Sequence, residues 1–229
     1  TRFSVDAELS SSTLTVNEGK VRATRLSDGS TVEVTARHRV VAALDCELIP
    51  EEMPDSVTLW QSHLENGRKR NYGEWMPAHG AEPPHLKTVP LTLSAKDDRK
   101  QRTIHTLSMP VSQGDHPPVV LQPETKIRVR GKIASNHRIW FGMTLRRENG
   151  DFAGRFQTIL PAEEFKSGEP FEVVLNLSDY HLDPSLAQWA ESLPKAPYDL
   201  IVQNVWCHTL WDPAGLQVSE IELMIPTEE

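Results

Sequence analysis

Cysteine, long apolar runs and positive charge are all scarce in this sequence. The 229 residues include two cysteines, Cys46 and Cys207. Two cysteines are too few for a disulfide framework, and their spacing is not that of metal ligands. No run of about 18 apolar residues occurs, so we expect no membrane segment. The 24 Lys and Arg are outnumbered by 32 Asp and Glu. The resulting net charge of −8 argues against general nucleic-acid binding, which needs a basic surface.

The two cysteines leave two alternatives open. A Cys46–Cys207 disulfide is chemically permitted if the chain lies outside the cytoplasm. Free cysteine is, however, a common small core residue. The alternation of residues 199–208 places the Cys207 side chain in the core, so we favour two buried free thiols over the disulfide.

Motifs of the common enzyme classes are absent as well. The sequence contains no G-x-S-x-G, no phosphate loop and no H-E-x-x-H. His79 and His85 lie in a Pro-rich stretch without a recognised ligand spacing, so we predict no metal site and no cofactor. Glu220 and Glu222 share a strand face and could form a glycosidase-like pair or bind calcium, although such carboxylates are usually only solubilising. An enzymatic function is left open without the support of a motif.

Seventeen prolines are many for this length, and they disfavour long helices. Most of the chain reads as short alternating segments between turn residues, which is typical of antiparallel sheets. The one helical pattern covers 184–193, with Asp183 as its N-cap and Pro184 at its first position. The predicted fold class is all-β, an antiparallel β-sandwich (jelly roll) preceded by a small β-meander. In the sandwich we predict strands over 101–109, 126–133, 138–147, 153–160, 170–177, 199–208 and 216–225.

The meander occupies residues 1–45. "NEGK" at 17–20 is a predicted turn, and "LSDGST" at 26–31 is a hairpin with Asp-Gly at its tip. The "TRF" at 1–3, the "EGKV" at 18–21 and this hairpin resemble the C-terminal half of the FecR domain, the sensor domain of membrane-bound bacterial anti-sigma regulators. The chain departs from the family at Arg37-His38, where a glycine is frequent. The resemblance implies a β domain in the periplasm or at the cell surface that signals through a protein partner, and it implies no chemistry.

The domain organisation follows from changes in composition. Residues 46–56 are acidic and contain two prolines, so we predict a linker between a partial FecR-like domain (1–45) and the sandwich (57–229). The chain opens on "TRFSVDAEL", which resembles the middle of a strand, and we expect a longer protein. The layout of the sandwich strands resembles galactose-binding domains and carbohydrate-binding modules. That resemblance is one of fold.

Side chains alternate along a strand, so parity assigns them to faces. Phe141, Met143 and Leu145 read as core, as do Val205 and Cys207. Gln203 breaks the pattern of its strand, and a register with Leu200, Val202 and Trp206 inside is nearly as good. In the first register Arg128 and Arg130 could share an outer face with the predicted ligand-binding residues. Those are Trp140, Arg146, Arg155, Gln157, Asn204, Trp206 and His208.

This outer face has the composition of a sugar-binding surface. Flat aromatic rings cover the C–H face of a pyranose, and forked polar groups satisfy its hydroxyls. Arginines favour an anionic polysaccharide through bidentate pairing. Each tryptophan taken singly is, on the other hand, more often a core residue. Trp211 belongs to a predicted hairpin loop with a turn at Asp212-Pro213, where it caps the sandwich or lines a site.

Two functions from different classes follow from the sequence. The first is a non-catalytic glycan-binding module of a FecR-type cell-surface regulator. The second is a protein-interaction or structural sandwich with no small-molecule ligand. A glycoside hydrolase or lyase is a weaker third alternative, because it needs carboxylates clustered in a cleft. The exposure of Trp140 and Trp206 distinguishes the first two.

Overall fold

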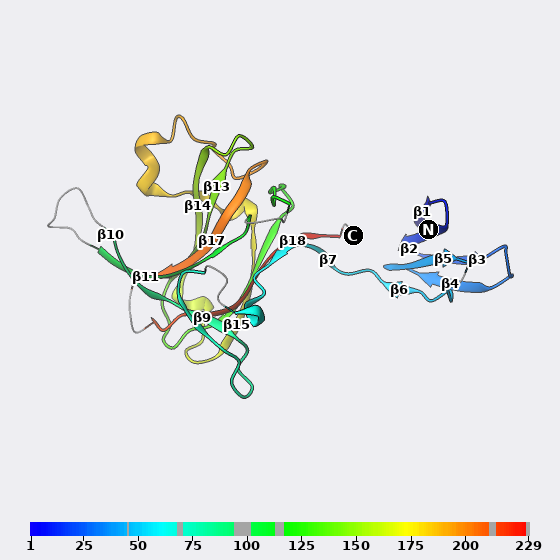
Figure 1. Ribbon diagram of the computed structural model, residues 1–229, viewed down its shortest axis with the longest axis horizontal. Helices are drawn as coiled ribbons and strands as arrows, with labels where there is room; N and C mark the ends of the chain where they lie inside the picture. The colour runs from blue at the N-terminus through cyan, green and yellow to red at the C-terminus, as the bar shows by residue number, and fades with distance from the viewer. Residues whose placement is uncertain (45, 68–70, 94–101, 113–116, 211–213, 228–229) are drawn as a thin grey trace. The chain divides into compact units, whose positions relative to one another are not determined.

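Nearly all regular structure in the computed structural model is β (Figure 1). The structure describes residues 1–44, 46–67, 71–93, 102–112, 117–210 and 214–227. The chain divides into one unit of Thr1–Val57 with Thr227, and a second unit of Thr58–Pro226. In the described part of the chain, no helix has the length and apolar character needed to cross a membrane. The turn predicted at Trp211 to Pro213 lies outside the described residues.

The first unit is the predicted meander. Strand order is β1-β2-β5-β6 in one sheet, and β3 pairs with β4 as a hairpin. Gly19 and Gly29 have φ of 84° and 73°, as the two predicted turns require. Alternation places Leu14, Val16, Val34 and Val40 in a small core. The strands are β1 (Arg2–Ala7), β2 (Ser11–Glu18), β3 (Lys20–Thr24), β4 (Thr31–Thr35), β5 (His38–Ala43) and β6 (Glu51–Glu52).

Two details of this unit bear on the sequence analysis. Arg37 has a φ of 63°, the left-handed region that glycine favours. Strand β6 pairs with β5 through Glu51 and Glu52. The segment 46–56 therefore contributes a short strand to the first sheet and is not wholly a linker.

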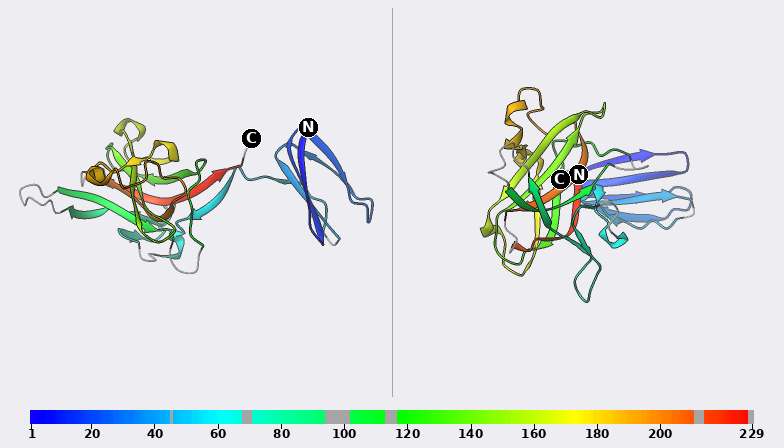
Figure 2. Two further views of the ribbon diagram at one scale, coloured as in Figure 1. Left: turned by 90° about the horizontal axis from the view of Figure 1, so that it is seen from above. Right: turned by 60° about the vertical axis from the view of Figure 1, so that its left-hand side comes forward.

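The second unit is an antiparallel sandwich whose two sheets pack face to face (Figure 2). One sheet has the order β10-β11-β17-β13-β14-β16, and we call it the groove sheet. Its strands are β10 (Val89–Leu93), β11 (Arg102–Pro110), β13 (Ile139–Arg146), β14 (Phe152–Leu160), β16 (His181–Leu182) and β17 (Ile201–Thr209).

The opposite sheet has the order β15-β12-β18-β9-β8, with β7 also paired to β18. Its strands are β7 (Ser56–Gln61), β8 (Glu74–Met76), β9 (His85–Lys87), β12 (Lys126–Lys132), β15 (Pro170–Asn176) and β18 (Gln217–Pro226). All seven strands predicted for the sandwich are present, which confirms the predicted fold class. β7, β8, β9, β10 and β16 were not predicted.

Short 3-10 helices complete the second unit. They are η1 (Leu64–Asn66), η3 (Ala162–Glu164), η4 (Leu177–Asp179) and η5 (Pro184–Trp189). In η5 the predicted cap is present, because the Asp183 carboxylate accepts a hydrogen bond from the Ser185 backbone N–H at 2.9 Å. The predicted helix over 184–193 is wrong in type and length, since η5 is a 3-10 helix that ends at Trp189.

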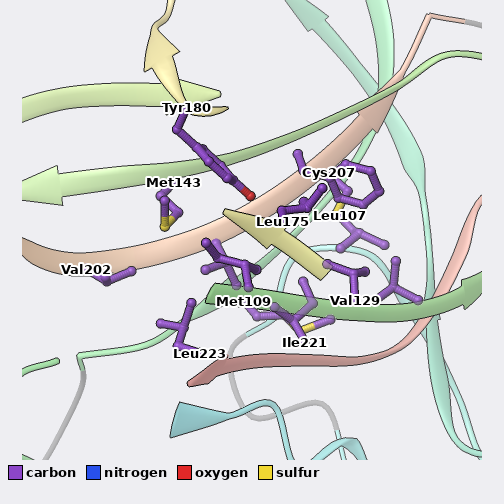
Figure 3. Close-up of a cluster of buried hydrophobic side chains, with 14 of the residues drawn as sticks. Leu107, Met109, Val129, Met143, Leu175, Tyr180, Val202, Cys207, Ile221 and Leu223 are labelled. Atoms are coloured by element: carbon purple, nitrogen blue, oxygen red, sulfur yellow. The ribbon is translucent and has the colours of Figure 1, made fainter. Parts of the chain in front are cut away.

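The core lies between the two sheets (Figure 3). Val129 and Ile221 from the opposite sheet meet Met143 and Cys207 from the groove sheet. The hydroxyl of Tyr180 points into this cluster. Both cysteines are free thiols, as we favoured; Cys207 is buried, whereas Cys46 is exposed and is not a core residue. Burial raises the pKa of the Cys207 thiol, so it stays protonated and acts as a small core residue.

The outer face of the opposite sheet carries a ladder of ion pairs. Arg128 Nη1 donates to Glu222 at 2.9 Å, and Arg130 Nη1 donates to Glu220 at 2.8 Å. Arg130 Nε also donates to Glu172 at 2.6 Å, and this hydrogen bond lowers the pKa of Glu172. Glu220 and Glu222, considered above as a glycosidase-like pair, as calcium ligands or as solubilising residues, are each paired with an arginine, and Glu222 is buried.

A candidate ligand-binding groove

A groove of about 660 Å³ runs over the outer face of the groove sheet. Apart from Tyr72, the lining residues come from the strands of the groove sheet and from the segment that follows β16. Among the described residues that line it, Asp183 is the one carboxylate. The lining consists of Tyr72, Leu91, Leu93, Arg102, Ile104, Thr106, Ser108, Trp140, Thr144, Arg155, Gln157, Ile159, Asp183, Pro184, Ser185, Asn204, Trp206 and His208.

A bulge in β17 explains why a second register fitted this strand nearly as well as the first. The pairing of β17 with β13 shifts between Thr144 and Leu145, and Gln203 is the extra residue. Before the bulge Leu200 and Val202 are buried, and after it Val205 and Cys207 are buried. The residues before Gln203 therefore follow the register with Leu200 and Val202 inside. The residues after Gln203 follow the register with Val205 and Cys207 inside. Trp206 faces outward as a result.

Three aromatic rings form the centre of the groove. Trp140 and His208 are cross-strand partners, and their rings are nearly parallel, with centroids 5.1 Å apart and an 8° interplanar angle. The Trp206 and His208 centroids are 5.4 Å apart at 21°. Gly142 is the cross-strand partner of Trp206, and a Cβ there would lie 2.1 Å from the Trp206 Cζ2. The Trp206 indole thus occupies the place of a side chain at 142.

Polar groups flank the rings at the next positions of the sheet. Asn204 Nδ2 donates to Ser108 Oγ at 3.0 Å, and its Oδ1 is buried with no hydrogen-bond partner in the described part of the chain. Arg155 Nη2 donates to Ser185 Oγ at 2.8 Å, and its Nε lies 3.1 Å from Asp183. Because η5 supplies Ser185 and its N-cap is Asp183, this segment holds Arg155 at one wall of the groove.

The structure brings together nearly all of the predicted site residues. Trp140, Arg155, Gln157, Asn204, Trp206 and His208 line the groove. Arg146 does not. It lies at the end of β13, where its Nε donates to Gln203 Oε1 at 2.9 Å. The placement of Arg128 and Arg130 on this face is wrong, because β12 belongs to the opposite sheet.

The remaining lining residues were not predicted as site residues. Arg102, Ile104, Thr106 and Ser108 follow each other at alternate positions of the predicted strand 101–109, so parity could have grouped them. The sequence carries no signal that this strand pairs with β17. Tyr72 enters through an isolated bridge to Ser108, in a stretch that shows no strand pattern.

His208 is neutral over the ordinary pH range. Burial in the groove is the main reason that its pKa falls from 6.5 to about 4. The nearby Arg102 cation lowers the pKa further, and the Asp183 carboxylate opposes this change. A neutral imidazole keeps one donor and one acceptor nitrogen available beside the tryptophans.

This pKa predicts a pH dependence of stability. Between pH 6.5 and about 4 the unfolded chain binds a proton at His208 that the folded chain does not. Stability is therefore complete above pH 6.5 and falls as the pH is lowered through this window, by up to about 3 kcal/mol. Urea unfolding at pH 7 and pH 4.5 measures the loss. We expect this loss of stability to be smaller in His208→Gln and the same as in wild type in the exposed control His63→Gln. An equal loss of stability in His208→Gln and in wild type would contradict the prediction.

Distant structural likenesses accompany this geometry. No family model matches the chain, and no curated protein matches it. A family 11 carbohydrate-binding module of the cellulosomal cellulase Lic26A-Cel5E of Clostridium thermocellum is 11% identical over 78% of this chain and 92% of that chain, with a TM-score of 0.42. A carbohydrate-binding module of the β-sandwich superfamily with promiscuous specificity is 10% identical over 99% and 97%, with a TM-score of 0.41.

A third structure is the isomalto-dextranase of Arthrobacter globiformis T6 complexed with panose. It is 9% identical over 93% of this chain and 35% of that chain, with a TM-score of 0.32. The sandwich fold of the second unit stands on its own strand order and register.

Proposed function

We propose that the second unit binds a glycan in the groove, without catalysis. The observation that carries this proposal is the set of three nearly parallel rings, with the Trp206 indole seated over Gly142. Trp140 and Trp206 are half-buried and line the groove, so part of each indole is left to contact the C–H face of a sugar. Gln157 and Asn204 flank it, and their amides can both donate to and accept from hydroxyl groups.

We further propose that the glycan is anionic. Three charged side chains line the groove: Arg102, Arg155 and Asp183. Arg155 and Asp183 pair with each other, and Arg102 is exposed with no ion-pair partner among the described residues. With His208 neutral, the described part of the lining carries one unmatched positive charge in a chain whose net charge is −8. A carboxylate or sulfate on the sugar would match it.

A matched pair of polymers tests both parts of the proposal. Polygalacturonate in an affinity gel should retard the wild-type protein, and its carboxyl-reduced derivative should retard it less. Arg102→Gln should lose roughly five-fold in affinity for polygalacturonate, about one exposed ion pair, and bind the reduced polymer as wild type does. Added salt should weaken the carboxylate-dependent part alone.

Arg22→Gln is the control, because it removes the same charge from an exposed position on β3. Equal retardation by the two polymers would contradict the anionic part of the proposal. No retardation by either would count against the glycan part.

For the first unit, we propose the protein-contact domain of a bacterial regulator in the periplasm or at the cell surface. The support is the FecR-like sequence of 1–45, which forms strands β1 to β5, and the left-handed φ of Arg37 beside the position of the family's glycine. A signalling protein would be its partner. A purely protein-interacting role for the second unit is the alternative to glycan binding, and it leaves the aromatic groove without an assigned ligand.

A further inference from the structure

The groove changes character along its strands. Next to the rings, Thr106 pairs with His208, and two residues further along β11 Ile104 pairs with Leu91 on β10. Two residues beyond, Arg102 pairs with Leu93. Each step of two residues is about 7 Å. The polar and aromatic surface therefore continues into an aliphatic one, which ends at a cation.

This aliphatic end is open to solvent. Leu91 is 37% exposed and Leu93 is 44% exposed, and both line the groove together with Ile104. Branched aliphatic side chains offer neither a flat ring for stacking nor a hydrogen bond for a hydroxyl. A plain sugar ring therefore gains little here, whereas a flexible hydrocarbon gains roughly 0.8 kcal/mol for each methylene that it buries.

We infer that the ligand is an acylated glycan, with its sugar on the Trp140–His208–Trp206 rings and its acyl chain over Leu91, Leu93 and Ile104. The inference rests on the proposed function and names its ligand more closely. The rings and the aliphatic side chains share one continuous groove, so a single ligand spans them.

Two glycosides that share a head group and differ in their tail test the inference. Tryptophan fluorescence measures the binding of n-octyl β-D-glucuronide and methyl β-D-glucuronide, with the octyl compound kept below its micellar concentration. The octyl compound should bind roughly 50-fold more tightly, the gain expected for about three buried methylenes. The double variant Leu91→Ser/Leu93→Ser should lose most of that preference and retain the affinity for the methyl compound.

Val174→Ser is the control, because Val174 is an exposed apolar residue of β15 on the opposite sheet. Equal affinity for the two glucuronides, with polygalacturonate still bound, would overturn the acyl inference and leave the proposed function intact. Failure of both glucuronides and of polygalacturonate to bind would overturn both. Self-association of wild type that the double variant abolishes, without any octyl preference, would show that a second copy covers the aliphatic end, and would also overturn the inference.

Discussion

Trp206→Ala should abolish retardation of the protein by polygalacturonate and still fold. Loss of the indole removes the ring seated over Gly142 and leaves His208 with one parallel neighbour, Trp140. Loss of an aromatic ring from a stacking surface costs about 5- to 150-fold in affinity, since stacking on nucleic-acid bases contributes roughly 1–3 kcal/mol for each ring. The affinity gel that tests the proposed function measures the loss directly.

The stability of Trp206→Ala separates a binding role from a structural one. Trp206 is half-buried on the outer face, whereas its neighbours Val205 and Cys207 are in the core. We therefore expect the unfolding free energy to fall by about 1–2 kcal/mol, less than the ~3–5 kcal/mol typical of a core tryptophan. Trp189→Ala, at a 52% exposed position of η5, is the matched control and should change neither binding nor stability. A core-sized loss in Trp206→Ala, with no glycan retarding wild type, would leave the interaction role standing.

Parity predicted six of the residues that line the groove, because alternation is a local property of a strand. Residues two apart on β17 must point the same way, so Asn204, Trp206 and His208 could be grouped without a structure. The bulge at Gln203 is the one place where this rule fails within the strand. There the sequence offered two registers, and each was right for half of β17.

The sequence could not predict which of the two sheets each strand joins, because this depends on pairing between segments far apart in the chain. Parity assigned Arg128 and Arg130 to an outward face, as it did Trp140. Their strand β12, however, pairs with β15 and β18 in the opposite sheet. The strand β10 was not predicted, because it is short, contains Pro90 and follows a Pro-rich segment, so its alternation was not recognised. For the same reason, the aliphatic end of the groove at Leu91 and Leu93 was not predicted.

Gly142→Ala should cost both stability and binding, and only while Trp206 is present. A Cβ at 142 would lie 2.1 to 2.5 Å from three ring atoms of Trp206, so the indole must lift from its place. We expect the unfolding free energy to fall by about 1–3 kcal/mol, the usual cost of overpacking, and the affinity for polygalacturonate to fall at least ten-fold.

The double variant Gly142→Ala/Trp206→Ala distinguishes this clash from a general intolerance of position 142. Glycine within a strand makes the folded protein less stable than alanine does, by roughly 0.5–1 kcal/mol. In the absence of the Trp206 indole, Gly142→Ala should therefore be neutral or stabilising. Urea unfolding of the four proteins of this cycle gives the coupling energy, which we expect to be at least about 1.5 kcal/mol. Additive losses would mean that Gly142 does not hold Trp206 in place. A large coupling would show that the absence of a side chain at 142 positions the ring on which the glycan is proposed to stack.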